Sequence, residues 1–289
     1  VTQGEPTFST LEVTGAATFD STVTVSGASS YIGAATFYNT VTVVGNAVFT
    51  ADIQKKTAGT SNFAAGVNAG NSIASGGNYN TVVGDEAGTG ITTGDSNVAI
   101  GYIALDANTI GSGNVAVGQD ALGANTTASN NTAVGYAVLA SNTTGTGNSA
   151  LGQGAAGANT TGGGLTAIGN GAGGANTTGN SNTAVGYQAL DANTTASSNT
   201  AVGSTALGAN TTGALNTAVG TGSLDANTTG GNNSAFGLGA LGSNTTGDSN
   251  NAHGLNALTD NVSGDGNTAM GHAALQDNLA DYNTAVGFQ

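Results

Sequence analysis

The sequence contains no cysteine, no tryptophan, no arginine and a single proline among its 289 residues. The absence of cysteine excludes disulfides and thiolate-metal sites. The only basic residues are Lys55 and Lys56, against 16 acidic ones, and the net charge is −14. So few cations cannot neutralise phosphate groups, which excludes nucleic acid as a partner. Electrostatic attraction to anionic membranes is excluded for the same reason.

Long apolar runs are also absent, and no stretch of 18 apolar residues could insert into a membrane. No secretory signal pattern opens the chain. Charged residues make up only 6% of the sequence, so solubility must come from Asn, Thr, Ser and Gly. This composition predicts an exposed location, on a virion surface or otherwise extracellular. The 50 glycines follow no collagen period, and we expect them at turns and close backbone contacts.

What the sequence has in abundance is repetition. The glycine of an Ala-Val-Gly triplet returns with a period of 17, while Gly287 comes one residue early and Gly66 lies one residue too far upstream. A strict period predicts one structural unit stacked on itself, as in a solenoid. The regular series is Gly84, Gly101, Gly118, Gly135, Gly152, Gly169, Gly186, Gly203, Gly220, Gly237, Gly254 and Gly271.

The repeats divide the chain into three parts. Residues 1–50 carry a six-residue period with Thr-Val-Thr-Val strand signals, and we expect a β shaft there. Three chains wound into a β-prism or triple β-helix would bury such short strands, and a single-chain β-helix is the alternative. Residues 51–79 are interpreted as a joint with a degenerate first coil. Residues 80–289 are predicted to form the 17-residue β-solenoid, so the fold class is all-β and elongated.

Two apolar columns follow from the period in the predicted solenoid. The position before the glycine, represented by Val185, and the position four after it, represented by Leu190, are apolar in nearly every coil. Stacked coil on coil, they would form continuous ladders, and we expect both to be buried. Two short strands per coil, interrupted by Gly186 and by the Asn-Thr-Thr-Gly turn, fit the spacing. No helical periodicity appears.

Two asparagine columns, represented by Asn182 and Asn193, recur with the same period. Identical amides stacked at strand spacing can hydrogen-bond along the axis. Asparagine also tolerates the left-handed conformation that tight corners need. Turn formation with an amide ladder is therefore the favoured interpretation. N-glycosylation of the repeated Asn-Thr-Thr sequon, and ice or glycan binding by a flat polar face, are the alternatives.

Residues that could carry chemistry are few and scattered. Asp106, Asp191 and Asp225 share a column but not adjacent coils, which favours solvated corners and leaves weak Ca²⁺ binding open. His253 and His272 lie on different columns and do not suggest a metal site. We expect His253 to fill a core position. No catalytic constellation is apparent, so neither enzymatic activity nor a bound cofactor is expected.

The segment Asn97-Val98-Ala99-Ile100-Gly101 resembles the S-V-A-I-G motif in heads of trimeric autotransporter adhesins. That resemblance implies a left-handed parallel β-roll that is obligately trimeric and binds host surfaces. Because the present period of 17 is longer than the typical head repeat, handedness stays open. The N-terminal hexads and the N-T-A-V-G-Y-x-A-L repeats are similar to those of tailed-phage fibres.

Together these features predict a structural and adhesive fibre, a phage tail or decoration fibre, that forms a homotrimer and contacts a host-surface glycan or envelope component. A bacterial adhesin head, or a self-assembling filament subunit, is the alternative. Uniform coils suggest that recognition lies where uniformity fails, near the C-terminal end. His272, Asp281 and Tyr282 are therefore the candidate receptor-binding residues, with simple capping as the competing interpretation. A further candidate is a sugar-stacking patch formed by the tyrosines that follow the repeat glycine: Tyr102, Tyr136 and Tyr187.

Overall fold

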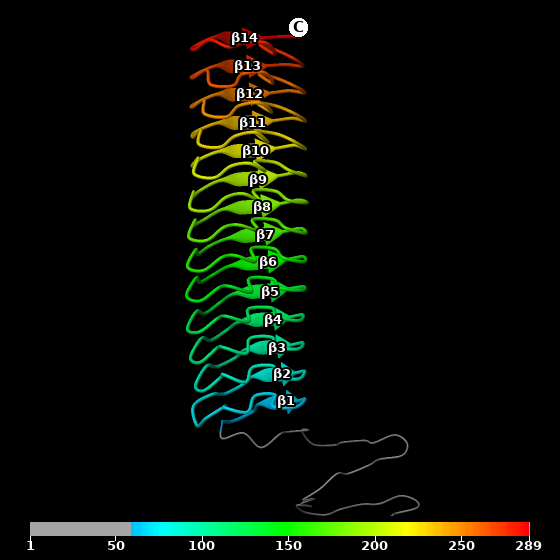
Figure 1. The fold of residues 1–289 in the computed structure, drawn as a ribbon, viewed down its shortest axis with the longest axis vertical. Helices are drawn as coiled ribbons and strands as arrows, with labels where there is room; N and C mark the ends of the chain where they lie inside the picture. Colours follow the sequence, from blue (N-terminus) through cyan, green and yellow to red (C-terminus); the bar gives the residue numbers. More distant parts are fainter. Residues whose placement is uncertain (1–58, 289) are drawn as a thin grey trace, which may run out of the picture. The chain divides into compact units, whose positions relative to one another are not determined.

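A computed structural model describes residues 59–288, and in these residues the chain is a parallel β-solenoid without helices. Its fourteen short strands are stacked in chain order, one above the next, as one parallel sheet (Figure 1). The hexad shaft expected for residues 1–50 lies outside the described residues. The strands are β1 Phe63–Ala65, β2 Thr81–Val83, β3 Val98–Ile100, β4 Val115–Val117, β5 Thr132–Val134, β6 Ser149–Leu151, β7 Thr166–Ile168, β8 Thr183–Val185, β9 Thr200–Val202, β10 Thr217–Val219, β11 Ser234–Phe236, β12 Asn251–His253, β13 Thr268–Met270 and β14 Thr284–Val286.

The 17-residue period of the sequence sets the register of this sheet. Val185 of β8 pairs with Ile168 of β7 and with Val202 of β9, each exactly one repeat away along the chain. The offset is one residue longer between β1 and β2 and one residue shorter between β13 and β14. The pairing stays aligned at both ends, so the extra or missing residue is absorbed outside the strands. The expected all-β solenoid with 17-residue coils is confirmed.

Each coil contains one strand, and the expectation of two strands per coil is wrong. The Asn-Thr-Thr segment does hydrogen-bond to the next coil, but the consecutive amides of Thr177 and Thr178 both donate to the Thr194 carbonyl, at 2.8 and 3.2 Å. In a strand, successive amides point to opposite sides. Two neighbouring amides that share one acceptor cannot continue a ladder, so this segment is a bend.

Left-handed backbone conformations recur in every coil, but the column asparagines do not supply them. In the coil of β8 the positive φ angles belong to Ser181, Gly186, Gln188 and Leu190. Gly186 has φ +141°, and a Cβ there would collide with the Gly203 carbonyl of the next coil. Glycine is required at this corner because neighbouring coils approach backbone to backbone. The expectation that the asparagines form the left-handed corners is therefore wrong.

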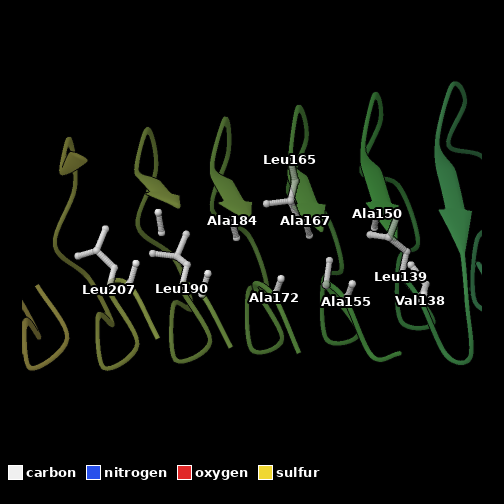
Figure 2. Packing of buried hydrophobic residues seen from close by; sticks show 14 of the residues in the cluster. Val138, Leu139, Ala150, Ala155, Leu165, Ala167, Ala172, Ala184, Leu190 and Leu207 are labelled. Atoms are coloured by element: carbon white, nitrogen blue, oxygen red, sulfur yellow. The ribbon is translucent and has the colours of Figure 1, made fainter. Parts of the chain in front are cut away.

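The interior is lined by the middle residue of each strand and by the leucine column. Ala184 and Leu190 are both fully buried (Figure 2). Val185, expected to be buried, points to the outside and is only half-buried. Strand side chains alternate between the two faces, and Ala184 takes the inner one. The leucines confirm their predicted burial, whereas the residues before the glycine line the outer face.

Two exceptions to the repeat preserve the volume of the interior. Where the leucine column holds Gly88, the second asparagine column holds Ile91, whose Cδ1 would be 2.8 Å from a Cβ on that glycine. In the coil of β7 the leucine column holds Gly173 while Leu165 replaces the strand-side asparagine. Figure 2 shows Leu165 nearer the strand wall than Leu190, and it is buried like the residues around it. Close packing of the interior explains the paired exchange.

Both asparagine columns form buried hydrogen-bonded ladders. The Nδ2 of Asn193 donates to Oδ1 of Asn176 at 2.8 Å and to the carbonyl of Ala196 at 3.0 Å. The Oδ1 of Asn182 accepts from the backbone amide of Asn199 at 2.9 Å, and its Nδ2 donates to the carbonyl of Ala196 at 2.8 Å. Buried polar groups need such partners, and the ladders provide them coil after coil. The amide-ladder interpretation is confirmed.

The ladder geometry argues against the glycosylation alternative. Asn193 opens an Asn-Thr-Thr sequon, yet it is fully buried and its Nδ2 makes two hydrogen bonds. A glycan on that nitrogen would replace a donor hydrogen and would need space inside the coil. Exposure rises steadily along the sequon from buried Asn193 through half-buried Thr194 to exposed Thr195. Strand residues would instead alternate between the two faces.

Candidate binding surfaces

The outer face of the sheet carries an exposed apolar column, which we call the apolar stripe. It consists of the last residue of each strand, and the ladder pairing places these residues directly above one another. Leu151 is 49% exposed and Ile168 is 41% exposed. An aliphatic surface that continues through most of the coils is unusual on an isolated soluble chain. From β2 to β14 its members are Val83, Ile100, Val117, Val134, Leu151, Ile168, Val185, Val202, Val219, Phe236, His253, Met270 and Val286.

His253 belongs to the apolar stripe and not to the core, so the expectation of a core position is wrong. It is only half-buried. Its imidazole stacks on the ring of Phe236 in the preceding coil, with centroids 4.5 Å apart and planes 20° from parallel. The strand alternation that points Val185 outward also points His253 outward. Phe236 and His253 are therefore two adjacent flat side chains on the outer face.

A second outer column consists of the residues that directly follow the repeat glycine, and we call it the post-glycine column. Tyr102 and Tyr136 are each 53% exposed, and Tyr187 is 55% exposed. Their backbone carbonyls accept hydrogen bonds from Asp120, Gly154 and Thr205, at 3.1, 3.0 and 2.9 Å. The identities in this column vary from coil to coil: Asp85, Tyr102, Gln119, Tyr136, Gln153, Asn170, Tyr187, Ser204, Thr221, Leu238, Leu255, His272 and Phe288.

The three residues predicted for recognition lie at the last coils but do not form one cluster. His272 is exposed and packs against Phe288, with ring centroids 4.9 Å apart. Asp281 accepts a hydrogen bond from the Asp265 backbone amide at 2.9 Å. Tyr282, 81% exposed, lies with its ring over Gly266. Within the described part of the chain, no interaction joins His272 to Asp281 or Tyr282.

The shortened last coil interrupts the ladder of the second asparagine column, whereas the strand-side ladder continues because the backbone amide of Asn283 donates to Oδ1 of Asn267 at 2.8 Å. Asn278 turns its Nδ2 to the carbonyl of Ala280 at 2.7 Å instead of to the preceding asparagine. The Oδ1 of Asn261 and the Nδ2 of Asn267 are then buried without hydrogen-bond partners. Sequence reasoning located the irregular end but missed this defect, although the shortened spacing between Asn278 and Asn283 is its visible signal.

Several acidic residues, among them Asp106, Asp120 and Asp191, lie in the segment between the repeat glycine and the second asparagine column. Burial raises the pKa of Asp106, and the neighbouring carboxylates Asp120 and Glu86 raise it further, while backbone hydrogen bonds act in the opposite direction. Burial also raises the pKa of Asp120 and of Asp191. In residues 59–288, no group of three or more His, Cys, Asp or Glu side chains is placed to hold a metal ion.

The fold defines the class of the protein: a parallel β-solenoid repeat protein with one three-residue strand per coil. Comparison with protein-family models, with curated proteins and with solved structures gave no match. Among the described residues there is no helix long and apolar enough to cross a membrane. The exposed columns are therefore the features of this chain that bear on its function.

Proposed function

We propose that the chain is a structural and adhesive fibre protein that forms a homotrimer and binds a glycan or another envelope component without turning it over. A phage tail or decoration fibre, on a virion surface, is the form we favour. The observation that carries the proposal is the apolar stripe, because it is continuous, parallel to the stack axis, and exposed or half-buried at every position. A surface of this kind supports burial against further copies.

Stripe geometry favours copies related by rotation about an axis parallel to the stack. Such a rotation would set Leu151 and Ile168 of one chain against the same column of another along its whole length. Closed rotational symmetry of this type is the common form of homo-oligomers. The choice of three copies rests on the resemblance to trimeric adhesin heads and phage fibres. Adhesion itself rests on that resemblance and on the polar, uniform surface that surrounds the stripe.

The assembly is tested by the mass of the full chain in solution. Light scattering should give three chains, and L151D/I168D should shift the mass toward one chain while circular dichroism still reports β structure. T161D/T178D is the matched control, since it adds the same charge in the same two coils on an exposed column. A native chain that is a folded monomer at micromolar concentration would reject the trimer.

The adhesive role is tested separately. The assembled fibre is incubated with isolated bacterial envelopes and with their released polysaccharide, and both retention and polysaccharide chain length are followed. Retention with unchanged chain length supports a binding protein. Shortened polysaccharide would identify an enzyme, and lack of retention on every envelope tested would reject adhesion.

Two alternatives remain distinguishable from this proposal. A bacterial adhesin head or a filament subunit would carry the same apolar stripe but would belong to a different particle. Imaging of the native particle distinguishes these alternatives from a phage fibre. Ice binding is less well supported, because in each Asn-Thr-Thr segment only the second threonine is exposed. The first, as in Thr177, donates through Oγ1 to the Thr194 carbonyl at 2.9 Å. A single file of threonines such as Thr195 offers no two-dimensional array to a lattice.

A further inference from the structure

We infer that the tyrosine part of the post-glycine column is a binding strip for a linear, uncharged glycan that lies parallel to the solenoid axis. The strip comprises residues of six consecutive coils: Tyr102, Gln119, Tyr136, Gln153, Asn170 and Tyr187. This inference rests on the proposed function and specifies its ligand. It places recognition along the shaft and not at the irregular C-terminal end.

The first argument is exposure without an internal partner. Each of the three tyrosines is about half exposed, and in the described residues none of the three hydroxyls makes a hydrogen bond. An exposed aromatic ring with a polar tip is suited to contacts that combine an apolar face with hydrogen bonding. Sugar rings offer both, since one face is rich in C–H groups and the edge carries hydroxyls.

The second argument is the spacing. Tyr102 and Tyr136 are two coils apart, and Tyr187 is three coils beyond Tyr136. At the strand separation of a β-sheet, these intervals are about 10 and 14 Å. The shorter interval is similar to the length of one disaccharide unit in an extended glycan. Two rings could therefore stack on alternate sugars of one chain.

The third argument is the chemistry between the rings. Gln119, Gln153 and Asn170 are exposed amides, and Nδ2 of Asn170 donates to Oε1 of Gln153 at 3.3 Å. Amides both donate and accept, as sugar hydroxyls do. They leave the strip uncharged and polar between its aromatic rings.

Rigidity adds to the fit. The carbonyls of Gln119 and Asn170 accept hydrogen bonds from the coils that follow them, each at 3.0 Å. The tyrosine carbonyls are held in the same way. A backbone fixed at every step presents its side chains at a constant rise, so binding costs little ordering of the protein.

Charge selects an uncharged ligand. No lysine or arginine occurs in residues 59–288, because Lys55 and Lys56 are the only basic residues of the chain. A polyanionic glycan would find no cation on the strip and would face the net negative charge of the chain. We therefore commit to a neutral linear polysaccharide as the ligand.

The test uses the full chain and three probes: cellohexaose and chitohexaose as neutral linear glycans, and heparin as a polyanion. Tyrosine fluorescence follows binding without interference from tryptophan, which the chain lacks. We expect saturable binding of at least one neutral probe, and none of heparin. Each of Y102A, Y136A and Y187A should weaken binding about three- to tenfold, and the triple variant more than thirtyfold.

L238A/L255A is the matched control, because both leucines are exposed in the same column but lie outside the strip. It should bind as the native chain does, and the melting temperature of each variant confirms folding. Failure of both neutral probes to bind, or equal binding by the triple variant, would overturn the inference. If bacterial envelopes retain the triple variant to the same extent as the native fibre, the inference about the strip is wrong, while the proposed adhesive function stands.

Discussion

The Cδ1 of Leu165 lies 3.9 Å from the position that a Cβ on Gly173 would occupy. These two residues break the repeat in the same coil, one in the strand-side asparagine column and the other in the leucine column. The contact shows that the two exceptions compensate one another. A large side chain enters from one wall where the opposite wall lacks one.

This contact predicts strong coupling between the two positions. L165N should lose about 2–4 kcal/mol of stability by opening a cavity, and G173L about 1–3 kcal/mol by overpacking. The double variant restores the consensus coil and should recover most of the loss. Urea unfolding of the native chain, the two single variants and the double variant measures the coupling energy in a double-mutant cycle. Losses that add within about 0.5 kcal/mol would show that the two residues do not share the space.

Truncation of the leucine column is expected to be the most damaging simple substitution. L190A removes a fully buried side chain and should cost about 2–5 kcal/mol. Q188A is the matched control, because Gln188 has a similar left-handed backbone, φ 50° against 54° for Leu190, but is not part of the core. Thermal melts of both variants compare them. Equal losses would mean that the backbone conformation, and not burial, sets the cost.

Removing one rung of the amide ladder should also destabilise the stack. In N193A the Oδ1 of Asn176 and the carbonyl of Ala196 each lose a buried donor. Both acceptors keep Nδ2 of Asn182 as a donor, so the cost is that of the lost hydrogen bonds, about 0.5–1.5 kcal/mol each. T195A, at an exposed position of the same segment, should change the melting temperature very little. Similar melting temperatures for N193A and T195A would mean that the ladder contributes nothing to stability.

Insertion of one threonine after Leu279 should repair the last coil. It restores between Asn278 and Asn283 the spacing found between Asn193 and Asn199. The Oδ1 of Asn261 and the Nδ2 of Asn267 would then regain partners. Hydrogen exchange of β13 and β14 should slow. Insertion of the same residue after Thr195 is the control, and it should speed exchange in the neighbouring coils by breaking a regular spacing.

The raised pKa of Asp106 predicts that the folded chain is more stable in mild acid than at neutral pH. Because burial raises its pKa in the folded state, the folded chain binds the proton more readily than the unfolded chain. Stability therefore increases as the pH falls through the raised pKa toward the ordinary value, and is lost as the pH rises. D106N should raise the melting temperature at pH 7 by about 1–3 °C and reduce the gain in acid. D277N, at an exposed site, controls for net charge, and an equal effect would assign the gain to charge alone.

The period by itself determined that identical coils stack in parallel, because only stacked coils repeat their contacts with the period of the sequence. It also determined the amide ladders and the burial of Leu190, since a residue type kept in nearly every coil must satisfy the same neighbours each time. The tyrosines of the post-glycine column could be aligned from the sequence, but their half exposure could not be read from it.

Only the tertiary structure decided which side of each strand faces inward. Hydrophobicity favoured Val185, yet the inner wall accepts the small side chain of Ala184 because Leu190 fills the space opposite. The one valine in that inner column, Val82, occurs in a coil where Gly88 leaves room, and a Cβ on this glycine would meet its Cγ1 at 2.5 Å. A three-residue strand has too short a pattern to fix its own orientation, so packing across the coil sets it and thereby exposes the apolar stripe.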